Sequence, residues 1–185
     1  MGDRYPRVNL RSPIHGDAEK RFRLGRSLEI EMMQGIIDPD PAVYSMGQAV
    51  AWFNRMQNHP CAWIIEAEDE LVGELRFDAI WIPDRSARLF VSLFNDRHLG
   101  CGIGRTALHQ GLDVVFNVMR LHRVDLRVLA ANARAIRCFE ACSFRREGIA
   151  REAARVGEAW RDELVMSILA NEYVAPRTAR IDRAA

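Results

Sequence analysis

The sequence predicts a single α/β domain, of the α+β type, built around one sheet. Its 185 residues are enough to bury one hydrophobic core. Strand-like apolar runs and helical repeats follow one another along the chain, and no linker or internal repeat divides them. We expect the domain to span residues 1–175, with a mobile polar tail at 176–185.

Composition excludes several classes of protein. Hydrophobic residues make up 49% and charged residues 28%, as in an ordinary globular domain. A formal net charge of +1 gives no global attraction to nucleic acid or to a membrane surface. No apolar run approaches the roughly 18–20 residues that span a bilayer, and the N-terminus has no apolar signal core. We therefore expect a cytoplasmic protein without nucleic-acid or membrane partners.

Metal binding is not indicated by the cysteines and histidines. None of the four cysteines forms a C-x-x-C pair, and the five histidines lack the spacing of metal ligands. Cys138 and Cys142 lie four residues apart on an expected helix, where small core residues are the simpler interpretation. The sequence predicts no metal site.

Hydrophobic spacing and turn residues give the expected elements. Strands are expected at Val8–Arg11, Cys61–Glu66, Leu71–Ala79, Arg88–Phe94, Val124–Ala130, Ile149–Val156 and Asp162–Leu169. Helices are expected at Asp17–Met33, Ser45–Gln57, Gly104–Met119 and Asn132–Cys142. Asp17 and Ser45 are expected to cap the first two helices, and Val50, Phe53 and Met56 to form the buried stripe of the second.

A glycine-rich loop between a strand and a helix is the most informative segment. Gly100, Gly102 and Gly104 stand where the expected third helix begins, with Arg105 in its first turn. A helix N-terminus carries unsatisfied N–H groups, and glycines let a bulky anion approach them closely. The loop contains neither G-x-x-x-x-G-K-[ST] nor G-x-G-x-x-G, so it matches neither of these nucleotide-binding loops. A merely flexible turn is the alternative.

With its neighbouring segments, the chain resembles the GNAT acetyltransferases. Gly102–Gly104 matches the end of that family's [QR]-x-x-G-x-[GA] loop, while Leu99 replaces its Gln or Arg. Residues 132–144 resemble the family's N-x-x-A-x-x-x-Y-x-x-x-G-F helix, with Phe139 in place of Tyr and Ser143 in place of Gly. Residues 146–173 resemble the ending of the RimJ/RimL branch.

The resemblance implies a mixed, mostly antiparallel central sheet whose fourth and fifth strands splay apart to admit acetyl-CoA. Pantetheine would pair with the backbone, the pyrophosphate would lie on the glycine loop, and one helix would supply further contacts. The implied cofactor-binding residues are Ser92, Leu93, Phe94, Gly100, Cys101, Gly102, Ile103, Gly104, Arg105, Asn132 and Phe139. Asn132 can also simply cap its helix. Dimers are frequent among such proteins, so a homodimer is an expectation.

The residues that would move protons are less clear. Phe139 has no hydroxyl where many relatives carry a tyrosine acid, so Ser143 or water would have to donate a proton. Asp125 and Glu74 are the candidate bases, each with an ordinary ion-paired strand residue as the alternative. A thiolate is a tolerable leaving group near neutral pH, since a thiol pKa is about 8.5. A dedicated acid is therefore dispensable.

Two classes of acceptor amine fit this pattern. Weak acid and base machinery favours an α-amine of pKa about 7.7–8.0, and RimJ/RimL relatives often acetylate protein N-termini. We therefore expect a peptide N-terminus as acceptor. The acidic Glu29, Glu31, Asp38 and Asp40 instead favour a polyamine or an aminoglycoside-like molecule, unless they form an ordinary solvated surface. A non-catalytic acyl-CoA-binding module is the third hypothesis.

Overall fold

A computed structural model describes residues 6–35 and 44–175, and the expected tail at 176–185 lies outside them. The strands are β1 (Val8–Arg11), β2 (Ala62–Ala67), β3 (Glu70–Trp81), β4 (Ser86–Leu93), β5 (Arg123–Leu129), β6 (Arg145–Val156) and β7 (Ala159–Leu169). The helices are α1 (Asp17–Leu24), α2 (Leu28–Met33), α3 (Met46–Gln57), α4 (Ile103–Asp113) and α5 (Ala133–Glu140). Every expected strand is present, with ends shifted by a few residues.

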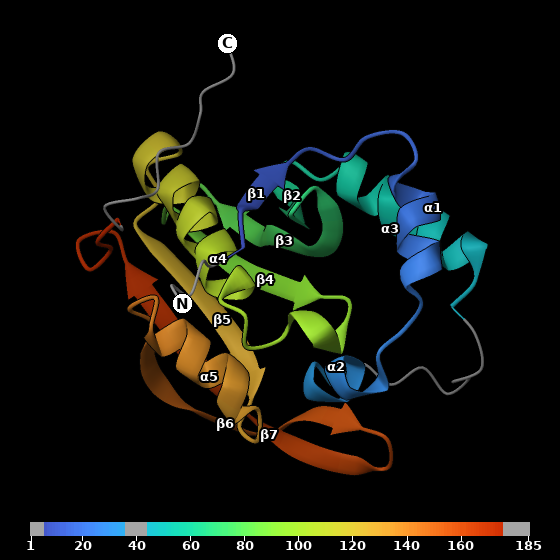
Figure 1. Cartoon of the computed structure of the whole chain (residues 1–185). Coiled ribbons are helices and arrows are strands. Elements are labelled where there is room, and N and C mark those ends of the chain that lie inside the picture. The colour runs from blue at the N-terminus through green and yellow to red at the C-terminus, as the bar shows by residue number, and fades with distance from the viewer. Residues whose placement is uncertain (1–5, 36–43, 176–185) are drawn as a thin grey trace, which may run out of the picture.

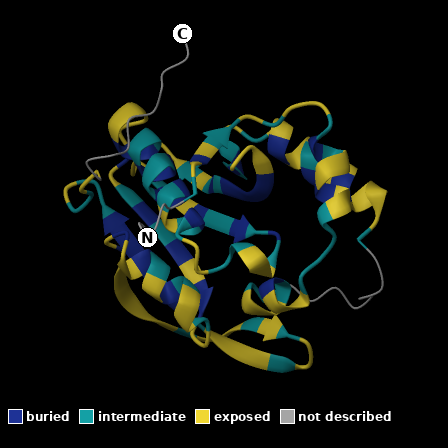
Figure 2. Cartoon of the chain, viewed as in Figure 1, coloured by how far each residue is buried: buried dark blue, intermediate teal, exposed yellow. Residues whose placement is uncertain are grey.

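Helices cover both faces of one seven-stranded sheet, in the order β1-β2-β3-β4-β5-β7-β6. The larger core lies under α4 and α5, and a smaller core around Trp52 and Phe94 lies under α3 on the other face. Figure 1 shows α4 and α5 in front of the sheet, with α1 and α3 packed together at its right. The outer part of the β6–β7 hairpin is exposed (Figure 2).

The fourth and fifth strands separate along their length, as expected. They are the sheet's parallel pair, and their pairing covers Ser86–Arg88 with Arg123–Asp125 only. The rest of β4 continues to pair with β3 on its other side, as far as Leu93. Because alternate residues of a strand direct their backbone groups to opposite sides, part of the β4 backbone faces the gap.

The first expected helix is in fact two helices, and this prediction was wrong. Gly25 follows α1 with a φ of 67°, which is left-handed backbone that ends a right-handed helix. Ser27 then caps α2, its hydroxyl accepting a hydrogen bond from the N–H of Ile30. The chain can thus turn sharply between α1 and α2, so the two helices take different directions.

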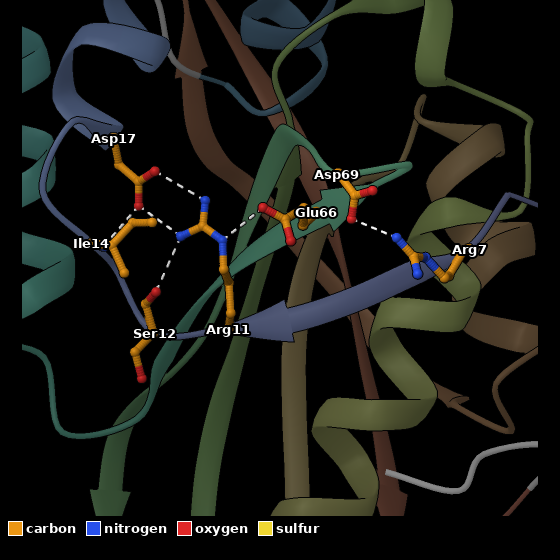
Figure 3. Close-up of polar contacts among 7 residues, drawn as sticks. All are labelled: Arg7, Arg11, Ser12, Ile14, Asp17, Glu66 and Asp69. Carbon is orange, nitrogen blue, oxygen red and sulfur yellow. Dashed lines mark hydrogen bonds and ion pairs between the residues drawn. The ribbon is translucent and has the colours of Figure 1, made fainter. Parts of the chain in front are cut away.

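Asp17 has a different role from the expected N-cap, because Gly16 occupies the cap position. The Asp17 carboxylate is fully buried and accepts the N–H of Ile14 at 2.9 Å. Arg11 reaches it with Nη1 at 2.8 Å and Nη2 at 3.0 Å, and places Nε 2.8 Å from Glu66 (Figure 3). This ion-pair network links β1 and β2 to the start of α1.

The α3 helix begins where the sequence predicts. Ser45 and Gln48 form a capping box, each side chain bonding the other's backbone. Of the predicted stripe, Met56 is buried and Phe53 packs, partly buried, against the smaller core, whereas Val50 is exposed and Ala49 and Trp52 complete the buried face. Trp52 lies on this buried face, so its polar Nε1–H is directed toward the sheet.

The helix after the glycine loop covers nearly the expected residues but changes type along its length. The α4 segment ends at Asp113 and continues as one π-helical turn, Val114–Val118. None of the helices in the described part of the chain combines the length and hydrophobicity that crossing a membrane requires.

Gly73 allows β3 and β4 to approach closely beside the splayed region. A Cβ there would lie 2.3 Å from the backbone oxygen of Ser92. We expect Gly73→Ala to lower the free energy of unfolding by about 1–3 kcal/mol, because the rigid backbone of β4 must move. Urea denaturation of this variant and of Gly148→Ala, whose Cβ would meet nothing within 4 Å, measures the difference. Equal midpoints would contradict the close approach.

Candidate active site

A cavity of about 570 Å³ opens between the splayed strands, and we call it the cleft. Its walls are residues 89–93 of β4, residues 126–128 of β5, the start of α4, one side of α5 and part of α2. The separation of β4 from β5 therefore produces a large hollow in the middle of the sheet.

The glycine loop forms one end of the cleft. Gly100, Gly102 and Gly104 all line it, and Gly102 is the N-cap of α4 with a φ of 80°. Of the loop residues predicted to bind cofactor, Cys101 and Ile103 are not in the lining. Cys101 is exposed and Ile103 is buried in the core. The helix N-terminus presents its N–H groups where an anion would be stabilised.

Four arginines line the cleft and add positive charge to it, namely Arg105, Arg127, Arg134 and Arg137. Arg105 is the predicted one, and Arg134 and Arg137 of α5 are two that the sequence interpretation missed. Arg134 lies 3.1 Å from Glu29. Glu29 was expected at the acceptor site, but it lines the cleft. Two arginines three residues apart, just after the motif Asn132, are the signal that could have revealed them.

Both predicted residues of α5 line the cleft. The Asn132 side chain caps α5 by accepting the N–H of Ala135 at 3.1 Å, and its amide donates to the Met33 oxygen at 3.1 Å. Asn132 thus fixes α2 against α5 at the cleft wall. Phe139 is buried and packs edge-on against Phe144, with ring centroids 5.8 Å apart. Cys138, also in the wall, has a lowered pKa because Cys142 donates a hydrogen bond to it.

A second cavity, of about 480 Å³, lies beside the cleft, and we call it the side chamber. It shares five lining residues with the cleft, namely Ile30, Gln34, Phe90, Ser92 and Leu93. Of the predicted β4 residues, Ser92 and Leu93 thus lie at the junction. Phe94 lines the side chamber alone, so its predicted place beside the cofactor is corrected.

Glu74 is the buried carboxylate of the side chamber. It stands opposite Ser92 in the β3–β4 register, where facing Cβ atoms are about 5 Å apart. Trp52 Nε1 donates to it at 3.1 Å, and Arg76 Nη1 lies 3.3 Å away. Arg55 Nη2 is 3.8 Å from its other oxygen. These contacts fix a carboxylate close to the point where the cleft and the chamber meet.

The other two candidate catalytic residues lie away from both cavities. Asp125 sits at the closed end of the β4–β5 pair, 2.6 Å from Arg88 Nε. Ser143 is exposed and has a φ of 71°, a backbone conformation that suits the glycine it replaces in the resemblance. Neither residue lines the cleft or the chamber. Among the three candidates, Glu74 alone lines one of these two cavities.

The two described residues of the predicted acidic patch, Glu29 and Glu31, are each paired with an arginine. Glu31 lines the side chamber, but its carboxylate is 2.5 Å from Arg26 Nη2. Asp38 and Asp40 lie outside the described residues. Within residues 6–35 and 44–175, no group of three or more His, Cys, Asp or Glu side chains could hold a metal ion.

Sequence comparison gives the family. The sequence profile of the acetyltransferase (GNAT) domain matches residues 7–145. The chain belongs to this family. The sheet with its splayed strands fits this family's fold, whereas the roles of the glycine loop and of the α5 residues, and the RimJ/RimL branch, remain predictions.

Two curated relatives share part of the sequence. A probable N-acetyltransferase, YjcK, from Bacillus subtilis is 32% identical over 56% of this chain and 57% of its own length. A spermidine N(1)-acetyltransferase from Vibrio cholerae is 30% identical over 59% of this chain and 62% of its own. The matched region thus spans less than two thirds of either relative.

A solved structure shares the fold across nearly the whole chain. It is the spermidine N-acetyltransferase from Vibrio cholerae in complex with CoA and spermine, with a TM-score of 0.75 and 24% identity. The superposition covers 90% of this chain and 97% of that one. The fold is therefore that of a GNAT domain, and β6 and β7 extend it beyond the residues that the profile matches.

Proposed function

We propose that this GNAT protein is an acetyl-CoA-dependent N-acetyltransferase. One observation supports this most directly. A cleft of about 570 Å³ between β4 and β5 ends on the N-terminus of α4, so an extended thioester arm and its anionic end fit one continuous site. Family membership supports the same cosubstrate.

The residues of the cleft fit coenzyme A along its length. Gly100, Gly102 and Gly104 would hold the pyrophosphate through backbone N–H groups, with Arg105 adding charge. The β4 backbone, unpaired toward β5 beyond Arg88, would pair with the amides of pantetheine. A backbone N–H at this edge would also polarise the thioester carbonyl, as in an oxyanion hole.

The side chamber would bring the acceptor to the thioester. Transfer forms a bond between the acceptor nitrogen and the acetyl carbon, and breaks the bond from that carbon to sulfur. The nitrogen must lose a proton, and Glu74 at the junction with Ser92 is the group placed to accept it. The sulfur leaves as thiolate or takes a proton from water, which suits a site where Phe139 supplies no hydroxyl.

We propose a small molecule as the acceptor rather than the protein N-terminus expected from the sequence. The Vibrio cholerae relative is named for spermidine, and the similar solved structure holds spermine. These names support the alternative acceptor given by the sequence, a small polyamine or aminoglycoside-like amine, better than a peptide N-terminus. A peptide N-terminus is the second candidate, favoured by an α-amine's lower pKa.

Calorimetry and thiol release together test the proposal. We expect acetyl-CoA and CoA to bind the purified chain, and free thiol to appear only when an acceptable amine is added. Peptides, spermidine and small monoamines form the acceptor panel. Binding without thiol release for any amine would support the non-catalytic acyl-CoA-binding alternative. No heat from either ligand at millimolar concentration would overturn the proposed function.

A further inference from the structure

The described lining of the side chamber carries more positive than negative charge, although two of the similar proteins are named for spermidine. Among its described lining residues are three arginines, Arg21, Arg55 and Arg76, and two carboxylates, Glu31 and Glu74. Glu31 is already bound by Arg26, just outside the lining. A polyamine presents only positive charge, so this chamber offers it little attraction and several repulsive contacts.

Arg21 places a buried guanidinium in the chamber wall. Its central carbon lies 4.0 Å from the centre of the Tyr44 ring and 4.2 Å from that of Phe94. Nη1 donates to the Gly25 oxygen at 2.5 Å, while Nε is buried without a hydrogen-bond partner among the described residues. Burial lowers the pKa of Arg21, because removing the guanidinium from water disfavours its charged form.

Arg76, another arginine of the chamber lining, likewise places its guanidinium over an aromatic ring. It stacks over Phe90 at 3.7 Å, and Nε lies 3.1 Å from both oxygens of Asp78. Nη1 is buried 3.3 Å from Glu74 without a hydrogen-bond partner in the described part of the chain. Both nitrogens, Arg21 Nε and Arg76 Nη1, are almost wholly enclosed, so an anionic ligand in the chamber would be attracted by the guanidinium charges of Arg21 and Arg76 and would not need to reach these two N–H groups.

We propose that the acceptor is a small amine that also carries an anionic oxygen group, a carboxylate or a phosphate. This inference rests on the proposed function and narrows its substrate class. The anionic group lies among Arg21, Arg55 and Arg76, and the amine points to Glu74 and the thioester. Glu74, the buried carboxylate of the chamber, then faces the reacting nitrogen. The arginines of the chamber face the anionic group of the acceptor.

Matched acceptor pairs on the unmodified chain test this inference. The pairs are β-alanine with propylamine, glycylglycine with glycylglycinamide, and phosphoethanolamine with ethanolamine, and spermidine is the polycation. We expect kcat/KM about 10- to 100-fold higher for the anionic member of at least one pair, as one charged hydrogen bond contributes. Comparing the pairs separates carboxylate from phosphate recognition.

Three outcomes would overturn the inference while acetyl-CoA still binds. They are equal kcat/KM within every pair, a higher value for spermidine than for any anionic acceptor, or no acetylation of the panel. Acetylation of spermidine or a neutral amine would leave the proposed function standing. Absence of acetyl-CoA binding would remove both.

Variants of the half-exposed Arg55 give an independent readout. Because Arg55 also contacts Glu74, the readout is the ratio of kcat/KM for the anionic acceptor to that for its neutral partner, which Arg55→Gln should lower about 3- to 10-fold. Arg55→Glu should shift the selectivity further, toward spermidine. Arg23→Gln, an exposed arginine of α1 paired with Glu19, is the matched control and should change neither ratio. Equal losses for both members of a pair would contradict the inferred contact.

Discussion

Gly104→Val is expected to raise the KM for acetyl-CoA about 100-fold while leaving the fold intact. Gly104 lines the cleft in the first turn of α4, and an added Cβ would lie 3.8 Å from Cys138 Sγ, another residue of the wall. The valine methyl groups would therefore occupy the space where the pyrophosphate meets the backbone. Losing one or two charged hydrogen bonds, each about 1.5–3 kcal/mol, gives this magnitude.

Stability separates the loss of binding from misfolding in this variant. Valine and glycine differ by only about 0.5 kcal/mol in helix propensity, so the free energy of unfolding should change little. Gly47→Val is the matched control, because Gly47 is an exposed helical glycine of α3 outside both cavities. Steady-state kinetics and urea denaturation measure the two effects. An unchanged KM for Gly104→Val would remove the glycine loop from the binding site.

Local sequence signals were sufficient to predict most of the fold. Ser45 and Gln48 form a capping box whose spacing is visible in the sequence, and Val8–Arg11 has the predicted strand bounds. The prediction of a single helix over Asp17–Met33 was wrong because the apolar spacing continues across Gly25, where α1 ends. A glycine inside a helical pattern is tolerated in some contexts, but here Gly25 ends α1 and Ser27 caps α2.

The cleft and the side chamber differ in how far the sequence could predict them. The glycine loop and Asn132 are short segments with local spacing, so their place in the cleft could be expected. The chamber instead joins Arg21 of α1, Arg55 of α3 and Arg76 of β3, which meet only after the chain folds. No local spacing connects them, and 25 of the 26 basic residues are arginines, so none stands out.

Glu74→Gln is expected to lower kcat/KM for the acceptor by about 10²- to 10⁴-fold, the usual contribution of a general base. Acetyl-CoA affinity should stay the same, because Glu74 lines the side chamber and not the cleft. Glutamine keeps an oxygen that can accept from Trp52 Nε1, so the strand and α3 stay connected. Asp125→Asn is the matched control on a strand carboxylate outside both cavities, and should change kcat/KM little.

The pH profile distinguishes a base from a residue that only supports the chamber. Without a base, the reaction depends on acceptor molecules that are already neutral, and their fraction increases tenfold per pH unit below the amine pKa. The deficit of Glu74→Gln relative to the unmodified chain should therefore shrink as pH rises toward that pKa. A structural defect would instead reduce the rate by the same factor at every pH. Because the substitution removes the charge of Glu74 beside Arg76, a melting curve would detect such a defect. A constant deficit across the profile would exclude Glu74 as the base.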